Sequence, residues 1–184
     1  ETQNTSGVFG QHDNLLPLAV YKNETHYCRM GPHLKNLARE MIREVDDVRF
    51  LHSLSELISQ KIVYKKGYTD SLTPADLSTS LGAGVCQDHV HIFLTLARSV
   101  GIAARYVSGY LVTDSKDSNT ESHAWAEAYV EGIGWTGFDI SNQISPDETY
   151  VRIASGFDYS DVQPVAGLRF GDGEETMTTQ VIIQ

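Results

Sequence analysis

The amino-acid sequence predicts an α+β fold in which helices pack on an antiparallel β-sheet. The main observation is a change of period: apolar residues recur at helical spacing up to about residue 100, and at every second position after it. Helices first and strands afterwards, without alternation, are typical of this fold class. The 184 residues, 41% of them hydrophobic and 21% charged, are enough for one domain with its own core.

The N-terminal end is predicted to be irregular. Residues 1–14 are polar and show no periodicity, so we expect a flexible leader followed by a single domain over residues 15–184. Residues 15–21 form a short apolar run that Pro17 interrupts, which favours an extended segment or an edge strand. Because the chain begins at Glu1 rather than Met, we expect a processed or trimmed piece of a longer chain.

Helices are expected in the first hundred residues. The first three begin at a proline or a capping residue, with Thr73 as the predicted N-cap of the third, and Gly101 ends the fourth. The predicted ranges are 31–43, 46–62, 73–81 and 86–100. In the fourth range apolar side chains cover most of the circumference, which predicts a helix buried on nearly all sides.

Strands are expected in the second half, joined by loops rich in Gly and Asp. The predicted ranges are 105–113, 123–131, 135–140, 151–156 and 177–183. A capping-box pattern at residues 145–148 predicts one helical turn among these strands.

Charge and cysteine content exclude several classes of function. The net charge is −10 and no basic stripe is present, so binding to nucleic acid or to an anionic membrane is not expected. Two cysteines cannot form a disulfide framework or a four-cysteine zinc site. No apolar run approaches the roughly 20 residues that span a bilayer, and no secretory segment is visible. We therefore expect a cytoplasmic protein, although a signal on a longer precursor would lie outside this sequence.

Cys86 is the candidate nucleophile. It stands where the glycine-rich turn containing Gly82 and Gly84 enters the buried helix. A helix N-terminus presents unpaired N–H groups and a positive partial charge, which stabilise a thiolate. The backbone N–H of Cys86 can also donate to an oxyanion. The alternative is a buried structural cysteine, but such a residue needs neither a Gly-x-Gly approach nor a helix start.

His123 and Asp139 are the candidate base and orienting group. A three-residue loop at 131–133 would pair the two flanking strands with Trp125 opposite Asp139. His123 and Asp139 would then be diagonal neighbours on one face, within side-chain reach. An Asp in this position would hold the His tautomer and stabilise the imidazolium. The alternative is that Asp139 only starts a turn, which is a common role of Asp.

Four ordered blocks carry a resemblance to a known family. They are GVCQD, RSVGIAARYVSGY, HAWAE and WTGFD, which begin at residues 84, 98, 123 and 135. Together they resemble the transglutaminase-like superfamily, and more closely its bacterial branch of proposed cysteine proteases. The resemblance implies a papain-like core in which the Cys-bearing helix packs on the antiparallel sheet, with Cys86, His123 and Asp139 as the catalytic triad. It also implies a β-rich region before this domain in many bacterial members, which this sequence does not contain.

Three further residues are predicted to contact substrate. Gln87 follows the nucleophile and can alternatively help to cap the helix. Trp125 is one of several strand aromatics that can line a groove or belong to the core. Tyr159 lies in a segment, residues 158–164, that recurs in the resembling branch.

The sequence departs from the family pattern at Ala103, Ile140 and Phe157, where the family usually has Pro, Pro and Arg. The first two are backbone preferences that leave the chemistry intact. The third can change a binding contact.

No cofactor or metal is expected. A zinc site of Cys86, His89, His91 and His123 is disfavoured, because His89 shares a helix face with Cys86 whereas His91 points elsewhere. The two histidines are better explained as helix-packing residues. The acidic loops at 114–117 and 158–161 lack the spacing of a calcium loop, so we expect solvated charge there.

The sequence thus predicts a thiol enzyme of the acyl-transfer class with a peptide or protein amide as substrate. Hydrolysis, as by a cysteine protease or amidase, is favoured because no feature excludes water or builds an amine site. Protein-glutamine transamidation and a catalytically idle peptide-binding domain are the alternatives. The sequence predicts no oligomeric state.

Overall fold

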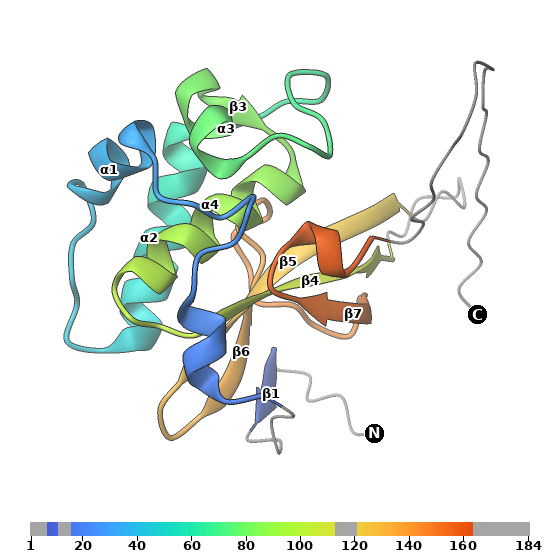
Figure 1. Cartoon of the computed structure of the whole chain (residues 1–184). Helices are drawn as coiled ribbons and strands as arrows, with labels where there is room; N and C mark the ends of the chain where they lie inside the picture. The colour runs from blue at the N-terminus through green and yellow to red at the C-terminus, as the bar shows by residue number, and fades with distance from the viewer. Residues whose placement is uncertain (1–6, 11–15, 113–120, 164–184) are drawn as a thin grey trace.

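The computed structural model describes residues 7–10, 16–112 and 121–163 and shows a helical layer packed on an antiparallel sheet (Figure 1). Among these residues the sheet has five strands in the order β1-β6-β5-β4-β7, with every pair antiparallel. They are β1 (Val8–Gly10), β4 (Ala104–Leu111), β5 (Glu121–Val130), β6 (Gly134–Phe138) and β7 (Tyr150–Gly156). The α+β prediction is confirmed. The predicted strand at 177–183 lies outside the described residues.

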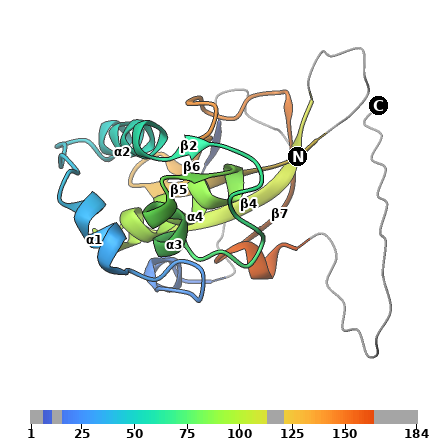
Figure 2. The ribbon, with the colours of Figure 1, turned by 90° about the horizontal axis from the view of Figure 1, so that it is seen from above.

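The helical layer is arranged around α4. Its members are α1 (Pro32–Ala38), α2 (Asp47–Lys61), α3 (Ala75–Leu81) and α4 (Cys86–Ser99). Helix α4 contacts β4 and β5 on one side and the other three helices elsewhere, as Figures 1 and 2 show. A short parallel pair, β2 (Val63–Tyr64) with β3 (Ala83–Gly84), was not predicted and leads directly into α4.

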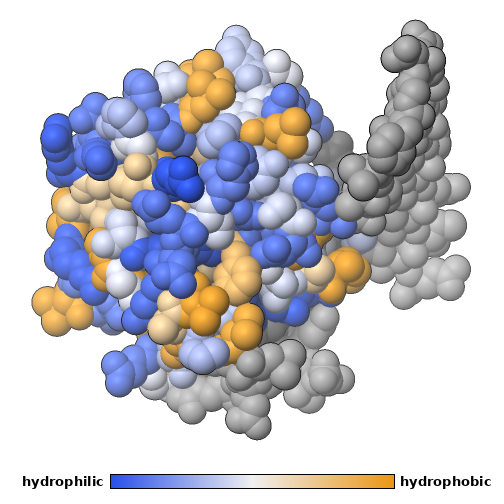
Figure 3. Space-filling model, in the orientation of Figure 1, coloured by the Kyte–Doolittle hydropathy of each residue, from blue (hydrophilic) through white to orange (hydrophobic). Residues whose placement is uncertain are grey.

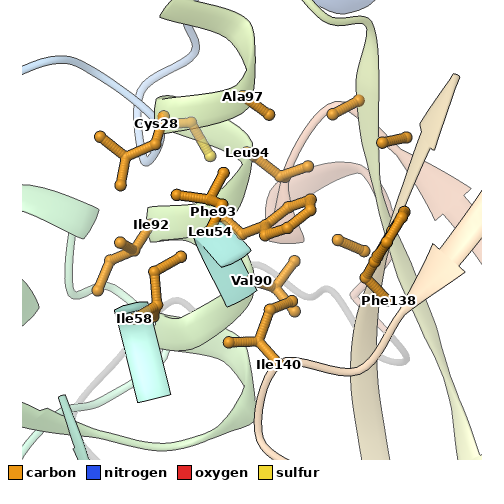
Figure 4. Packing of buried hydrophobic residues seen from close by; sticks show 14 of the residues in the cluster. Cys28, Leu54, Ile58, Val90, Ile92, Phe93, Leu94, Ala97, Phe138 and Ile140 are labelled. Atoms are coloured by element: carbon orange, nitrogen blue, oxygen red, sulfur yellow. The ribbon is translucent and has the colours of Figure 1, made fainter. Parts of the chain in front are cut away.

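Helix α4 is buried on all sides, as its apolar pattern predicted. Residues 88–98 are all buried. Phe93 faces the sheet, where its ring lies 5.5 Å from that of Phe138 on β6. Ile92 lies on the side of α2, toward Ile58 (Figure 4). Because each such side chain contributes about 2 kcal/mol when fully buried, this packing fixes the position of the residue that begins the helix.

The two faces of the sheet follow the period of two that the sequence predicted. Ala124, Ala126 and Ala128 belong to the main core under α4. Their small size lets the helix lie close to β5. Trp125 belongs to a separate cluster with Val107 and Tyr150 on the other face.

The N-terminal end differs from the prediction. Val8–Gly10, inside the predicted flexible leader, form an edge strand on β6. The N–H of Gly137 donates to the carbonyl of Gly7 at 2.7 Å, and Gly7 is buried. The free edge of β6 supplies hydrogen-bond partners for the backbone of this segment, and the polar composition of the segment does not reveal them.

The apolar run at 15–21 was predicted as extended chain, and this is wrong for its second half. Leu18–Lys22 form a 3₁₀ helix, η1, closed by a bond from the N–H of Val20 to the carbonyl of Pro17. The reason is positional, since proline is compatible with the start of a helical turn. Tyr21 of this helix packs edge-on against Trp135, with ring centroids 5.1 Å apart.

Three boundaries inside the domain also differ. Helix α1 ends at Ala38 rather than at residue 43. The N–H groups of the next three residues donate to carbonyls three residues earlier, as in a 3₁₀ turn, so the α-helical bonding stops there. Helix α3 begins after Pro74, while the Thr73 hydroxyl accepts from the N–H of Asp70 instead of capping the helix. Strand β6 ends at Phe138, two residues earlier than predicted, because the next residue turns the chain.

The helical turn predicted at residues 145–148 is absent. Asp147 instead forms a turn in which its carboxylate accepts from the N–H of Thr149 at 2.9 Å. Its carbonyl accepts from the N–H of Tyr150, where β7 begins. The Asp side chain therefore makes an Asx turn into a strand, which competes with capping a helix.

In the described part of the chain, none of the helices combines the length and apolarity that a membrane crossing requires. On the face shown in Figure 3 the surface is largely hydrophilic, with apolar side chains in separate spots.

Candidate active site

Cys86 is held at the N-terminus of α4 by a local hydrogen-bond network. It is the first helical residue and is half-buried. The carboxylate of Asp88 accepts from the N–H of Val85 at 2.8 Å and from the hydroxyl of Thr69 at 2.7 Å. A Cβ at Gly84 would lie 2.6 Å from the Asp88 side chain, so only glycine permits this approach. The glycine thus lets the acidic residue cap the helix that presents the thiol.

The β5–β6 hairpin brings His123 and Asp139 together. Its loop is the three residues 131–133, and the observed register, continued by one pair, sets Trp125 opposite Asp139 as predicted. His123 Nε2 lies 2.6 Å from Asp139 Oδ2. The side chain of Cys86 lies close enough to the same ring to raise the pKa of His123. The structure therefore brings His123 into a hydrogen bond with Asp139 and places Cys86 near the same ring.

Asp139 is a buried carboxylate surrounded by donors. It is 1% exposed, and Oδ2 also accepts from the hydroxyl of Tyr150 and the side-chain amide of Asn142, each at 2.7 Å. Oδ1 accepts from the backbone N–H of Ser141 at 3.0 Å. Burial by itself would raise the pKa of Asp139, but the bonds from His123, Tyr150 and Asn142 hold that pKa below its ordinary value. Asp139 is thereby kept ionised beside His123.

Sequence reasoning missed Tyr150 and Asn142. The Asp-Ile-Ser-Asn run is an Asx-turn pattern, and it could have indicated that Asn142 folds back on Asp139. No local signal indicates Tyr150, because it reaches the carboxylate from β7, a strand that pairs with β4 rather than with β6.

His123 is held in place by aromatic rings. Its ring is stacked at 6.4 Å on that of Trp125 and lies 5.9 Å from that of Tyr150. Gly109, which pairs with His123 across the sheet, makes room for this arrangement, because a Cβ there would lie 2.7 Å from the Trp125 ring. Such packing limits the ring to a narrow range of orientations.

The electrostatics of His123 favour its protonated form. Burial lowers its pKa, but this is outweighed by the hydrogen bond to Asp139 and by the nearby side chains of Asp139 and Cys86, which together raise the pKa to about 9. A raised pKa in the folded state stabilises the fold fully below the unfolded value of about 6.5. This contribution is lost as the pH rises through about 9.

The three predicted substrate residues occupy different environments. Gln87 is half-buried, and its amide donates to the carbonyl of Ser71 at 3.1 Å, which ties the preceding loop to the helix start. Tyr159 is half-buried and packs edge-on against Tyr106. Trp125 is 0% exposed, so in this structure it lies behind His123 and does not form a substrate-facing wall. The physical reason is that its face of β5 is covered by a second small core.

His89 and His91, which were considered as zinc ligands, form hydrogen bonds within the protein. His91 is fully buried, burial lowers its pKa to about 3, and Nε2 accepts from the N–H of Tyr159. His89 is buried too, and both its ring nitrogens have protein partners. Among the described residues, no three His, Cys, Asp or Glu side chains are arranged to hold a metal ion.

The acidic loop at 158–161 also differs from expectation. Asp158 was predicted to be solvated, but it is 2% exposed and accepts from the N–H of Ser160 at the start of η2 (Tyr159–Asp161). The loop at 114–117 lies outside the described residues.

The two cysteines are expected to differ in reactivity. Cys86 is half-buried beside His123, whereas Cys28 is fully buried and burial raises its pKa to about 12. At pH 7 iodoacetamide should therefore alkylate Cys86 at least about a hundredfold faster than Cys28, since the thiolate is the reacting form. Peptide mapping by mass spectrometry over time measures both rates. Equal rates in the folded protein would contradict the assignment, and equal rates in denaturant are the control.

Comparison with known proteins identifies the family. The model of the transglutaminase-like superfamily matches residues 35–140, which is more than half of the chain and includes Cys86, His123 and Asp139. The chain belongs to the transglutaminase-like superfamily. The packing of the helix that begins at Cys86 on the antiparallel sheet is the arrangement that the resemblance implied.

Relatives with curated sequences are uncharacterized proteins of mycobacteria. One from Mycobacterium leprae is 39% identical over 105 residues, which cover 54% of this chain and 37% of the relative. One from Mycobacterium bovis is 31% identical over 140 residues, which cover 71% of this chain and 45% of the relative. This chain thus spans less than half the length of these relatives.

Solved structures show the same fold. A candidate cysteine protease from Cytophaga hutchinsonii is 30% identical with a TM-score of 0.67, and the match covers 79% of this chain and 49% of that one. The periplasmic domain of TgpA from Pseudomonas aeruginosa is 19% identical with a TM-score of 0.51, and the match covers 67% of this chain and 46% of that one. The second likeness concerns the fold alone.

Proposed function

We propose that this transglutaminase-like chain is a thiol acyl-transfer enzyme that hydrolyses an amide bond of a peptide or protein. The observation that carries the proposal is that His123, hydrogen-bonded to the ionised Asp139, adjoins Cys86 at the start of α4. A nucleophile, a base and a group that orients the base are the parts that covalent acyl transfer needs. The likeness to a candidate cysteine protease supports the same chemistry.

Acylation begins with attack of the Cys86 thiolate on the carbonyl carbon of the amide. The S–C bond forms, the carbonyl oxygen becomes an oxyanion, and the backbone N–H of Cys86 at the start of α4 is placed to stabilise it. When the C–N bond breaks, protonated His123 gives its proton to the departing amine. The products of this half-reaction are a free amine, neutral His123 and a thioester on Cys86.

Deacylation reverses the proton transfer with water as the nucleophile. Neutral His123 takes a proton from the water, whose oxygen attacks the thioester carbonyl. The S–C bond breaks, a carboxylic acid leaves, and Cys86 returns as a thiolate beside protonated His123. Asp139 orients the ring through both half-reactions and stabilises the imidazolium.

Gln87 and Tyr159 remain our proposed substrate contacts. Both are half-buried: Gln87 follows the nucleophile on α4, and Tyr159 packs edge-on against Tyr106. Trp125 is proposed instead to support the His123 ring.

The compartment in which the enzyme acts is proposed to be the cytoplasm, where a catalytic thiol stays reduced. Fractionation of the source cells with an antibody to the chain checks it.

Hydrolysis is distinguished from cross-linking by a partition experiment. Both routes share the thioester. Water is present at about 55 M, so an amine competes with it only where a site gives the amine a high effective molarity. We expect mostly free acid when a glutamine- or peptide-amide substrate is supplied with a millimolar fluorescent primary amine. Both products are followed by chromatography. Dominant incorporation of the amine would overturn the hydrolase assignment and leave the triad intact, whereas no product of either kind would favour the idle peptide-binding domain.

A further inference from the structure

His89 occupies a position that the triad does not explain. It lies three residues after Cys86 on α4 and is 1% exposed. Its Nε2 is 3.0 Å from the carbonyl oxygen of Ile62, just after α2, and its Nδ1 is 3.0 Å from the hydroxyl oxygen of Ser141. The ring also meets Tyr64 edge-on at 6.0 Å. Because both nitrogens are hydrogen-bonded and the Tyr64 ring packs against it, the His89 ring is held in one orientation.

The two partners determine the tautomer of His89. A carbonyl oxygen can only accept, so Nε2 must carry the hydrogen that is shared with Ile62. In the neutral ring Nδ1 then has a lone pair, which accepts the hydroxyl hydrogen of Ser141. Burial lowers the pKa of His89, more than the Ile62 bond and the Asp139 charge raise it, so the ring is neutral at pH 7.

Ser141 belongs to the turn that holds the carboxylate. Its backbone N–H donates to Asp139 Oδ1 at 3.0 Å, while its side chain donates to His89. The same turn has a second attachment, because the amide of Gln143 donates to both the carbonyl and the hydroxyl of Ser55 on α2, each at 3.0 Å. The turn is thus fastened to the helical layer, not only to the sheet from which it emerges.

We propose that His89 is a positioning residue that sets the Asp139 turn against the helix carrying Cys86. Through Ser141, it links the element that presents the thiol to the element that orients His123, and these two elements otherwise belong to different layers of the fold. The kinetic part of this inference rests on the proposed function, whereas the structural part does not.

The test uses small changes at both ends of the link. Ser141→Ala removes the hydroxyl, His89→Phe keeps a flat ring but removes both nitrogens, and His89→Gln retains a donor and an acceptor. Ser53→Ala, an exposed serine on α2, is the matched control. A circular-dichroism melt of each variant shows that it is folded. If His89→Phe does not fold, Ser141→Ala decides the test.

The first readout is the titration of His123 by NMR in a Cys86→Ala background. Without the thiol, Asp139 is the remaining partner that raises the pKa of His123. We expect His123 to titrate at lower pH in Ser141→Ala and His89→Phe than in the background protein, and His89→Gln to restore part of the difference. Unchanged titration in folded Ser141→Ala and His89→Phe would overturn the proposal, even if the chain had no enzymatic activity.

The second readout is kinetic and uses the chain with Cys86 present. Loss of one neutral buried hydrogen bond predicts about a fivefold lower kcat for Ser141→Ala, with KM within about twofold. The double variant His89→Phe with Ser141→Ala should be no slower than His89→Phe alone, because both changes break one link. Additive losses would show that the two residues act separately and would contradict the link. Absence of turnover in the wild type would refute the proposed function, while the titration would still decide the role of His89.

Discussion

Replacing Cys86 with alanine is expected to reduce turnover by about 10⁵-fold or more, which is close to the detection limit of most assays. The expected loss is large because Cys86 provides the atom that forms the thioester, and no described neighbour can replace it. The substitution removes one sulfur atom from a half-buried position at a helix start, so the fold should remain intact. Steady-state hydrolysis of a fluorogenic peptide amide measures the turnover, and a thermal melt shows whether the variant is folded.

Cys28→Ala is the matched control for this experiment. Cys28 is 0% exposed in the main core, so its truncation should lower stability by about 1–2 kcal/mol while turnover remains. The two variants are thus expected to behave oppositely. Undiminished turnover in Cys86→Ala, or complete loss in a folded Cys28→Ala, would contradict the assignment of the nucleophile.

Asp139→Asn is expected to lower kcat by about 10⁴-fold, which is the size that the corresponding change has in a serine triad. The amide that replaces one carboxylate oxygen is a donor. It would face donors from His123, Tyr150 and Asn142, which now point at that carboxylate. The ring of His123 would lose the acceptor that selects its tautomer. Steady-state kinetics measures the loss, and Tyr150→Phe, which removes one donor and keeps the carboxylate, should have a much smaller effect.

The pH dependence of the same variant supplies an independent check. In the wild type, activity should fall as the pH rises through about 9, because His123 then loses the proton that the departing amine needs. Asp139 raises the pKa of His123, so Asp139→Asn should move this alkaline limb to lower pH. The pKa of Asp139 itself is lowered, so its stabilising contribution is present at neutral pH and is lost only in acid. An alkaline limb at the same pH in both proteins would argue against the role of Asp139.

Part of the site could be read from local patterns. The position of Cys86 at the start of a buried helix follows from a Gly-x-Gly approach and an apolar circumference, both of which act over neighbouring residues. The approach of His123 to Asp139 follows from one three-residue loop, because the strand period of two then leaves a single register. The alternative role considered for Asp139 is also present, since Oδ1 accepts from the turn while Oδ2 accepts from His123.

Other features depend on contacts between distant segments. Tyr150 lies on β7, and only the sheet order brings its hydroxyl to Asp139. Trp125 shares a face with His123 by alternation, but whether that face meets solvent depends on the cluster that covers it. The edge strand at Val8–Gly10 forms because β6 has a free edge, which is a property of the assembled sheet.

The sequence by itself determined the fold class, the family, the position of Cys86 at a helix start and the register that brings His123 near Asp139. These depend on periodicity, on turn length and on motifs within one or two elements. Only the tertiary structure decided how these residues are supported: which donors surround Asp139, which rings hold His123, and how His89 joins the helix to the turn. The physical reason is that a supporting hydrogen bond or ring contact needs two groups at the right distance, and the chain folds them together from segments with no pattern in common.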